Sequence, residues 1–430
     1  MFKPNMFKWI SDLFSINRSI TGEGVRKTLA YFQKINPELK LIKFKTGKKV
    51  FDWKIPDEWS IRDAYIQNQK GQKFAEFKKN NLHIVGYSVP INKWVNKKDL
   101  IKKIYTLKKS KSYIPYVTSY YKKDWGFCMS ELQKKKFIIG KKFRVKIDSN
   151  LKKGFLDCGH AIIKGKNKKE IFFSSNICHP SMANNELSGP TLINAILLYL
   201  KKNYPNNFYT YRFILVPETI GSLAYLSKYL KPMKKNIFSG YVLSCVGDNN
   251  NYSIIKSRNE NNLSEKMLYS FLEKKKNLKI YSYLERGSDE RQYCSPGIDL
   301  PMCGFSRSKY GEYKEYHTSA DNLNFISKKG LENSLDIFCK IIDILELGII
   351  PKRQSLGEPF LAKKKLYNTK SLWNKNDYER SLKLRMDFLA YCDNKENIFD
   401  IKKKINCSFD DLVSEYKILL KSGVLKSGYY

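Results

Sequence analysis

Two histidines and two glutamates of this sequence stand where side chains can do chemistry. His179 follows an apolar run typical of a buried central strand, and Pro180, which cannot donate to a sheet, marks the end of that strand. Glu186 lies in the polar loop that follows, Glu218 in the turn after the next apolar run, and His317 before a long helical stretch. Open α/β sheets bind ligands at the carboxyl ends of their strands, so the four side chains are candidates for one site.

Histidine and glutamate in this pattern indicate a metal site. The chain has only four histidines, and these two each lie in a loop with carboxylates nearby, as a zinc site requires. Glu218 is either a metal ligand or a general base. The structural alternative is that each histidine is satisfied inside a core and that Glu218 binds backbone donors at a helix start. A further polar loop, Gly287 to Arg291, follows a predicted strand.

The composition predicts a globular protein of two or three domains. The chain has 430 residues, of which 42% are hydrophobic and 14% aromatic, enough for a large core. The sequence has no apolar run of the ~20 residues that span a bilayer, and its start does not resemble a secretory signal. Nine cysteines are scattered singly, which fits reduced thiols. We therefore expect a cytoplasmic protein.

The charge is strongly positive. Lysine and arginine number 79 against 41 acidic residues, a net charge of +38. One interpretation is a polyanionic partner such as nucleic acid or a membrane surface. The lysines are, however, dispersed over every segment without one arginine-rich block, which favours a lysine-biased composition. In either case the surface favours anionic ligands.

The texture of the sequence predicts four segments. Residues 1–45 have helical spacing, and residues 46–147 have the short alternating runs of a small β-rich unit. Strands and helices alternate in residues 148–352, the pattern of an α/β sheet. Residues 358–430 form a separate helical unit. Within the β-rich unit, the aromatic stretch from Ser112 to Cys128 either lines a ligand surface or packs the small domain.

The α/β segment and the last segment contain the following predicted elements. The strands are expected at 170–178, 209–216, 240–246, 278–284 and 300–305. The helices between them are expected at 189–202, 221–230, 263–275 and 328–347. The last segment is expected to contain helices at 378–392, 398–405 and 409–422.

The spacing of the last two helices predicts a helix-turn-helix, and the chain after them resembles the wing of a winged helix. Such a unit binds DNA or serves as a docking or dimerisation module. Asp410, Asp411 and Glu415 on the third helix would repel phosphates, which disfavours nucleic acid.

Motifs in distant blocks resemble one family. His179 in CHP, the loop NNELSG, Glu218 before IGS, and YHTSAD with His317 resemble zinc aminopeptidases of the bacterial leucyl aminopeptidase and glutaminyl cyclase type. The chain is more closely similar to bacterial aminopeptidase-like proteins encoded among polysaccharide-biosynthesis genes. The blocks that carry this resemblance are INRSITGEGVRKTL, VFDWKIPDEWSIRDAYI, IPYVTSYYKKDWGFC, ICHPSMANNELSGP, GSDERQYCSPGIDLP and YGEYKEYHTSADNL.

The resemblance implies a fold: an α/β protein whose mixed sheet has helices on both faces, with an inserted β-rich small domain and a C-terminal winged helix. It also implies a reduced metal site, because Asn185 stands where the family has a bridging aspartate. A neutral amide is a poor bridge between two cations, so we expect one zinc ion at most. The expected ligands are His179, Glu186 and His317, with Glu218 as base; if Glu218 is instead a ligand, the base is unassigned.

Two further residues receive roles by the same resemblance. Asp289 would orient a ligand histidine or bind the amino group of the substrate. Tyr316, or the loop from Arg307 to Tyr310, would donate to the developing oxyanion.

The expected function is that of a zinc-dependent, aminopeptidase-like amide hydrolase in surface-polysaccharide biosynthesis. Its substrate would be a peptide, or an aminoacyl or acylamino-sugar compound. The alternative is a catalytically impaired binding or regulatory protein whose winged helix binds a partner or DNA. The sequence leaves a homo-oligomer open.

Overall fold

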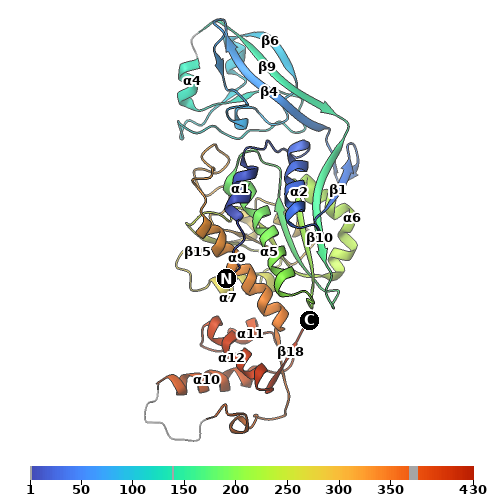
Figure 1. The fold of residues 1–430 in the computed structure, drawn as a ribbon, viewed down its shortest axis with the longest axis vertical. Helices are drawn as coiled ribbons and strands as arrows, with labels where there is room; N and C mark the ends of the chain where they lie inside the picture. Colours follow the sequence, from blue (N-terminus) through green and yellow to red (C-terminus); the bar gives the residue numbers. More distant parts are fainter. Residues whose placement is uncertain (1, 138–139, 368–375) are drawn as a thin grey trace.

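Three units follow one another along the long axis of the molecule (Figure 1). The computed structural model describes residues 2–137, 140–367 and 376–430. A small sheet lies at one end, the α/β body in the middle, and the helices α10 to α12 at the other end.

The α/β body is built on a mixed eight-stranded sheet. The central strands β12, β11, β13 and β16 are parallel to one another, and every residue of β11 and β12 is buried. Burial on both faces explains why each strand contains an apolar run, although β11 and β12 also bury polar side chains such as Ser174 and Arg212. From edge to edge the strands are β1 (Lys40–Lys45), β10 (Phe155–Ile163), β12 (Thr210–Val216), β11 (Glu170–Asn176), β13 (Ile237–Leu243), β16 (Met302–Ser306), β14 (Tyr252–Ile255) and β15 (Leu278–Tyr281).

Helices cover both faces of this sheet, as predicted. Adjacent residues of β11 point to opposite sides, so Phe173 joins one core and Phe172 the other. The Phe173 side is packed by α1 (Met6–Phe14), α2 (Glu23–Ile35), α5 (Ser188–Asn203), α7 (Leu263–Leu272) and α9 (Lys328–Leu347). The Phe172 side is packed by α6 (Ile220–Asn236) and the short α8 (Glu290–Tyr293).

The small unit is dominated by two long antiparallel strands, β4 (Glu58–Asn68) and β9 (Lys142–Lys152). They lie at the centre of a four-stranded sheet, and β9 leads directly into β10 of the large sheet. The other elements of this region are β2 (Lys49–Val50), β3 (Trp53–Lys54), β5 (Lys73–Phe74), η1 (Asn81–His83), β6 (Ile91–Asn96), α3 (Lys97–Ile101), β7 (Ile104–Tyr105), β8 (Phe127–Cys128) and α4 (Glu131–Phe137).

One arginine joins the small unit to the body. Arg26 of α2 contacts Glu58 at the start of β4, with 2.6 Å between Nη2 and Oε1. The same guanidinium contacts Asp157 of β10, with 2.9 Å between Nη1 and Oδ2. The helix, the small sheet and the large sheet therefore meet at one cation.

The last unit has the winged-helix arrangement. Its helices are α10 (Asn376–Tyr391), α11 (Ile398–Lys402) and α12 (Phe409–Lys421), with the short η4 (Leu361–Lys364) before them. The wing is the antiparallel pair β17 (Ile350–Arg353) and β18 (Leu425–Gly428), which brings residues from both sides of the helices together.

The winged helix is docked on α7 through aromatic side chains. Phe409, the first residue of α12, lies edge-on to Phe271 of α7 with 5.0 Å between ring centroids, and it stacks on Phe399 of α11. Lys402 pairs with Glu273 at 3.0 Å beside these rings. The core of the body therefore continues into the winged helix.

The predicted role of Glu415 as a surface acid is wrong. Its carboxylate is 4% exposed and accepts from Arg385 at 2.6 Å, so it is neutralised inside the unit. Asp410 and Asp411 are exposed, as the prediction required.

Within the described ranges, no helix combines the length and apolar character needed to cross a membrane. The nine cysteines are all free thiols.

Candidate active site

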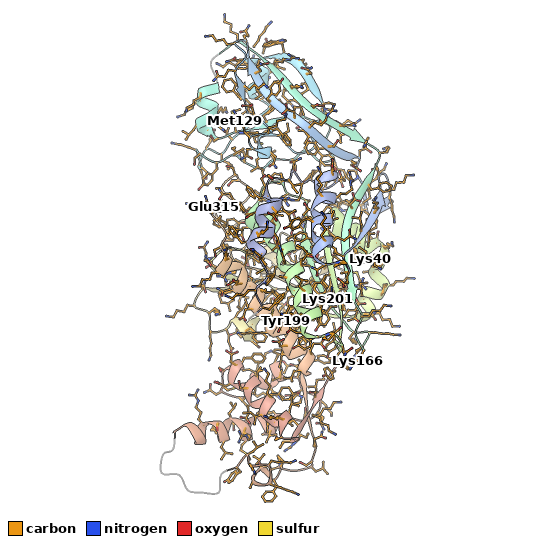
Figure 2. All side chains as sticks on the ribbon, viewed as in Figure 1. Lys40, Met129, Lys166, Tyr199, Lys201 and Glu315 are labelled. Atoms are coloured by element: carbon orange, nitrogen blue, oxygen red, sulfur yellow. The ribbon has the colours of Figure 1, made fainter. Side chains whose placement is uncertain are left out.

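The predicted site residues come from different loops of the α/β body. His179 follows β11, Glu218 follows β12, and His317 lies in the loop before α9. Figure 2 labels Glu315, in the loop of His317, at the level where the small unit meets the body. His179, Glu218 and His317 line one cavity of about 440 Å³. The structure thus brings together three side chains that lie far apart in the sequence.

The two ring nitrogens of His179 face different carboxylates. Nδ1 lies 2.7 Å from Oε2 of Glu186, which is fully buried. Nε2 lies 3.8 Å from Oε2 of Glu218, on the cavity side. Glu186 therefore contacts the Nδ1 side of His179, whereas Glu218 faces its Nε2 side; the predicted ligand role of Glu186 stays a prediction.

Burial and neighbouring charges shift the pKa values of His179 and Glu218. Burial alone would lower the pKa of His179, but Cys178 and Glu186 beside it raise the pKa well above its usual range. Burial also raises the pKa of Glu218, and the nearby His179 and Arg291 oppose that rise. A carboxyl group with a raised pKa is suited to proton transfer near neutral pH.

His317 faces the same space as His179. The two ring centroids are 5.1 Å apart, and the His317 ring stacks on Tyr316 at 3.9 Å. Its Nε2 is buried and has no hydrogen-bond partner. Burial, together with the neighbouring His179, lowers the pKa of His317 to about 2, so the ring is a neutral base with a free nitrogen.

The donor types around the cavity are those that zinc binds. Imidazole nitrogens and carboxylate oxygens are zinc ligands, and the buried Nε2 of His317 has no hydrogen-bond partner. In the part of the chain that the structure describes, the side chains whose ligand atoms all lie within 4.8 Å of one another are Cys178, His179 and Glu186. That cluster uses the Nδ1 side of His179, away from Glu218, so we favour the cavity side for an ion that acts on a substrate.

The donors do not fit two ions. Asn185 is buried, and its amide nitrogen lies 3.7 Å from Sγ of Cys245. Its Oδ1 is buried without a partner, so it offers a single neutral oxygen where a bridging carboxylate would be needed. Thr219 follows Glu218 and adds no second acid.

The predicted role of Asp289 beside a histidine does not match its contacts. Its Oδ1 accepts from the Thr219 N–H at 2.8 Å and from Oγ of Ser222 at 2.9 Å. Burial and the neighbouring Glu218 raise the pKa of Asp289 to about 7. Asp289 therefore supports the turn that carries Glu218, and Tyr316 supports the His317 ring by stacking.

Four residues with left-handed backbone lie in the loops of the predicted site residues or contact one of them. Ser181, Thr219, Cys245 and His317 have φ values of 40°, 65°, 56° and 55°, in a region that residues other than glycine rarely adopt. Each such residue costs roughly 1–3 kcal/mol and persists only where the surroundings enforce it. The loops of the site are therefore held by strong contacts.

Two of those contacts were missed from the sequence. Arg18, 1% exposed, donates from Nε to the His179 carbonyl at 3.0 Å. Asp321 accepts from the N–H groups of Asn184 and Asn185 at 2.6 and 2.9 Å, and so caps the π-helical turn η2 (Ala183–Leu187). Both residues lie in quoted motifs, INRSITGEG and YHTSAD, which was the available signal.

The aromatic stretch 112–128 forms a wall of the cavity. The Tyr116 ring lies 5.0 Å from the ring of His179 and 5.1 Å from that of His317, and its hydroxyl lies 2.6 Å from that of Tyr120. The Tyr116 N–H donates to the His317 carbonyl at 2.8 Å. Both interpretations hold for part of this stretch: Tyr116 and Tyr120 line the cavity, whereas Phe127 and Cys128 are buried in the hydrophobic packing.

Comparisons with known proteins cover nearly the whole chain. The family model described as "Domain of unknown function (DUF4910)" matches residues 7–348, and a winged helix-turn-helix model matches residues 349–427. A "Putative polysaccharide biosynthesis protein with aminopeptidase-like domain" from Clostridium acetobutylicum is 38% identical over 414 residues, 94% of this chain and 92% of that protein.

Solved structures agree with these matches. A crystal structure of a "putative peptidase" from Clostridium acetobutylicum has a TM-score of 0.89 at 36% identity and covers 98% of this chain and 95% of that one. BSAP, a zinc aminopeptidase from Bacillus subtilis, has a TM-score of 0.57 at 15% identity, over 80% of this chain and 95% of that one. The predicted aminopeptidase-like fold with a C-terminal winged helix is confirmed.

Proposed function

The chain belongs to the family of the domain of unknown function DUF4910, aminopeptidase-like proteins with a C-terminal winged helix-turn-helix, and on this premise we propose that it is a zinc-dependent amide hydrolase. We place its reaction in polysaccharide biosynthesis, because the Clostridium relative carries that description. The observation that carries the proposal is the meeting of His179, Glu218 and His317 in one cavity.

The residues divide the work as follows. His179, through Nε2, and His317 would hold the ion, and Glu186 would fix the ring of His179 from its other side. The chemistry that zinc supplies when bound is polarisation of an amide carbonyl and activation of water. Glu218, which accepts from Oγ of Ser288 at 2.9 Å, takes the proton of the attacking water and returns it to the leaving amine. The carbon–nitrogen bond breaks, and an acid and an amine are released.

The first test is metal content and turnover of the full chain. Elemental analysis is expected to find close to one zinc per chain, and hydrolysis of a panel of aminoacyl-anilides and N-acyl compounds should stop with a chelator and return with zinc. A chain that neither retains zinc nor hydrolyses any amide overturns the proposal.

Glu218→Gln tests the role of the base. Turnover is expected to fall at least about 100-fold, since general-base catalysis contributes that much, while zinc content stays unchanged. Glu260→Gln, which changes an exposed acid paired with Lys256, is the matched control and should alter neither quantity. Loss of zinc in Glu218→Gln would make Glu218 a ligand instead.

A second function is favoured by one observation. Asn185 in place of a bridging carboxylate weakens the site, which is expected of a peptidase-fold protein that binds without catalysis. In that case the winged helix would bind a partner. DNA is the less suitable partner, because the start of α12, where such helices read bases, buries Phe409 against α7 and exposes Asp410 and Asp411, which repel phosphates.

A further inference from the structure

One arginine that lines the cavity forms no ion pair with any described residue, although its charge acts on the nearby Glu218. Arg291 of α8 lines the cavity, and one of its terminal nitrogens donates to Oγ1 of Thr219. Its Nε is buried and has no hydrogen-bond partner. Among the described residues this partly buried arginine forms no ion pair, whereas the buried Arg212 pairs with Glu170 at 2.6 Å. A guanidinium fork is suited to a carboxylate.

The cavity offers little to a free amine. Glu218 is the one acidic side chain among the described residues that line it, and Glu218 lies beside His179. Asp289 and Glu290 do not line the cavity: Asp289 accepts from Thr219 and Ser222 through Oδ1, and Glu290 accepts from the hydroxyl of Tyr310 through Oε1. The ammonium group of a substrate would therefore face the positive charge of Arg291, and apart from Glu218 the cavity lining offers no carboxylate to bind that group.

The opposite wall is aromatic. Tyr116 and Tyr120 line the cavity beside the histidines, and Trp53 and Tyr121 complete the wall with 5.9 Å between their ring centroids. Trp53 and Tyr121 are 41% and 56% exposed, so part of each ring is accessible to a ligand in the cavity. A volume of about 440 Å³ suits a small molecule rather than a polymer segment.

We infer that the substrate is a small N-acylated compound that bears a carboxylate and no free α-amine. Arg291 binds the carboxylate, and the aromatic wall packs the acyl group or a sugar ring. The inference rests on the proposed hydrolase function and narrows its substrate. The fold is that of aminopeptidases, whose substrates have a free amine, but the positive charge of Arg291 selects a carboxylate instead. Acyl amino acids and acidic acylamino sugars share this chemistry.

Calorimetric binding to the full chain tests the inference without turnover. The probes are hippurate (N-benzoylglycine), its neutral amide hippuramide, and phenylalaninamide, which carries a free amine. Hippurate is expected to bind at least about 10-fold more tightly than hippuramide, as a charge-assisted pair implies, and phenylalaninamide most weakly. N-acetylneuraminate distinguishes the two substrate classes. If it binds more tightly than hippurate, the substrate is an acidic acylamino sugar; if it binds more weakly, the substrate is an acyl amino acid.

Variants identify the residue. Arg291→Gln is expected to weaken hippurate about 10- to 100-fold and to leave hippuramide unchanged, which also shows that the cavity is intact. Arg286→Gln, which changes an exposed arginine of the same loop, should change neither affinity. The comparison of the three probes on the unchanged chain needs no variant, so a variant that does not fold still leaves a decisive result.

The outcomes separate this inference from the hydrolase proposal. Equal binding of hippurate and hippuramide, tightest binding of phenylalaninamide, or an Arg291→Gln chain that still prefers hippurate overturns the inference, whatever the zinc content. A chain without zinc or turnover that prefers hippurate through Arg291 overturns the hydrolase proposal and retains the anion site.

Discussion

His179 gives its two ring nitrogens to different carboxylates, and this division organises the chemistry of single residues in the site. Glu186 contacts Nδ1 from the buried side, while Glu218 faces Nε2 from the cavity. A carboxylate on the far nitrogen fixes the tautomer of a histidine and raises its basicity as a ligand. Under the proposed function, Glu186 orients the His179 ring and Glu218 acts as the general base.

Glu186→Gln tests the orienting role. The amide keeps the size of the side chain but loses its charge, so zinc affinity is expected to fall about 10- to 100-fold without being abolished. Competition with a chromogenic chelator measures this affinity, and Glu285→Gln on an exposed turn is the control. Complete loss of zinc binding would show that Glu186 ligates the ion directly.

At the scale of elements, the sequence predicts the buried centre of the fold better than its edges. The strands β11, β12, β13 and β16 lie within a few residues of the predicted ranges, because burial on both faces gives each of them an apolar run that the sequence shows. β1, β10 and β14 were not predicted. β1 alternates with lysines, so it matched the neighbouring β-rich texture, and β14 has only four residues among asparagines.

The candidate site follows the same rule. His179, Glu218 and His317 could be found because each ends or begins a predictable element. The role of Arg18 could not, because its contact with the His179 carbonyl spans 161 residues and the motif INRSITGEG that contains it does not reveal that contact. Trp53 and Arg291 likewise reach the cavity from separate segments, and only the tertiary arrangement shows that they share it.

Arg26→Met tests the junction of α2, β4 and β10. Asp157 is fully buried, so losing its cation should lower the free energy of unfolding by about 2–3 kcal/mol at pH 7. This is below the ~3–5 kcal/mol of a fully buried pair because the Arg26 side chain is 32% exposed. Urea denaturation measures the change.

The pH dependence of this loss has a definite sign. Burial raises the pKa of Asp157, and Arg26 opposes the rise, so the variant leaves that pKa higher still. An acid whose pKa is raised in the folded state binds protons more readily there than in the unfolded chain. The loss of free energy of unfolding caused by Arg26→Met should therefore become smaller as the pH falls toward the ordinary carboxyl range. Arg62→Met, which breaks an exposed pair with Asp148, should have no measurable effect. A deficit that does not depend on pH would contradict the account.

On the scale of the whole molecule, the winged helix is part of the body rather than a loosely attached unit. Phe271, Phe399 and Phe409 form one cluster across the junction, and the stacked rings of Phe208 and Tyr429 fasten the carboxyl end to the body at 3.7 Å between centroids. The two units should therefore unfold together.

Phe409→Ala tests this coupling. Removing a buried aromatic ring typically costs about 3–5 kcal/mol, and the loss should appear in the unfolding of the body as well as of the winged helix. Ile418→Ala, on the exposed face of the same helix, should change stability by less than about 0.5 kcal/mol. Two separate transitions, with only the smaller one affected, would mean that the units fold independently.

The hydrogen bond from the Tyr116 N–H to the His317 carbonyl has a consequence for the history of this architecture. His317 has left-handed backbone, and the segment that contains Tyr116 helps to hold it in that conformation. Without that segment, His317 should lose its position in the site. Relatives that lack the small unit should therefore also lack His317, or should hold it by a different contact. Relatives that keep His317 but have neither the small unit nor a replacement contact should be rare.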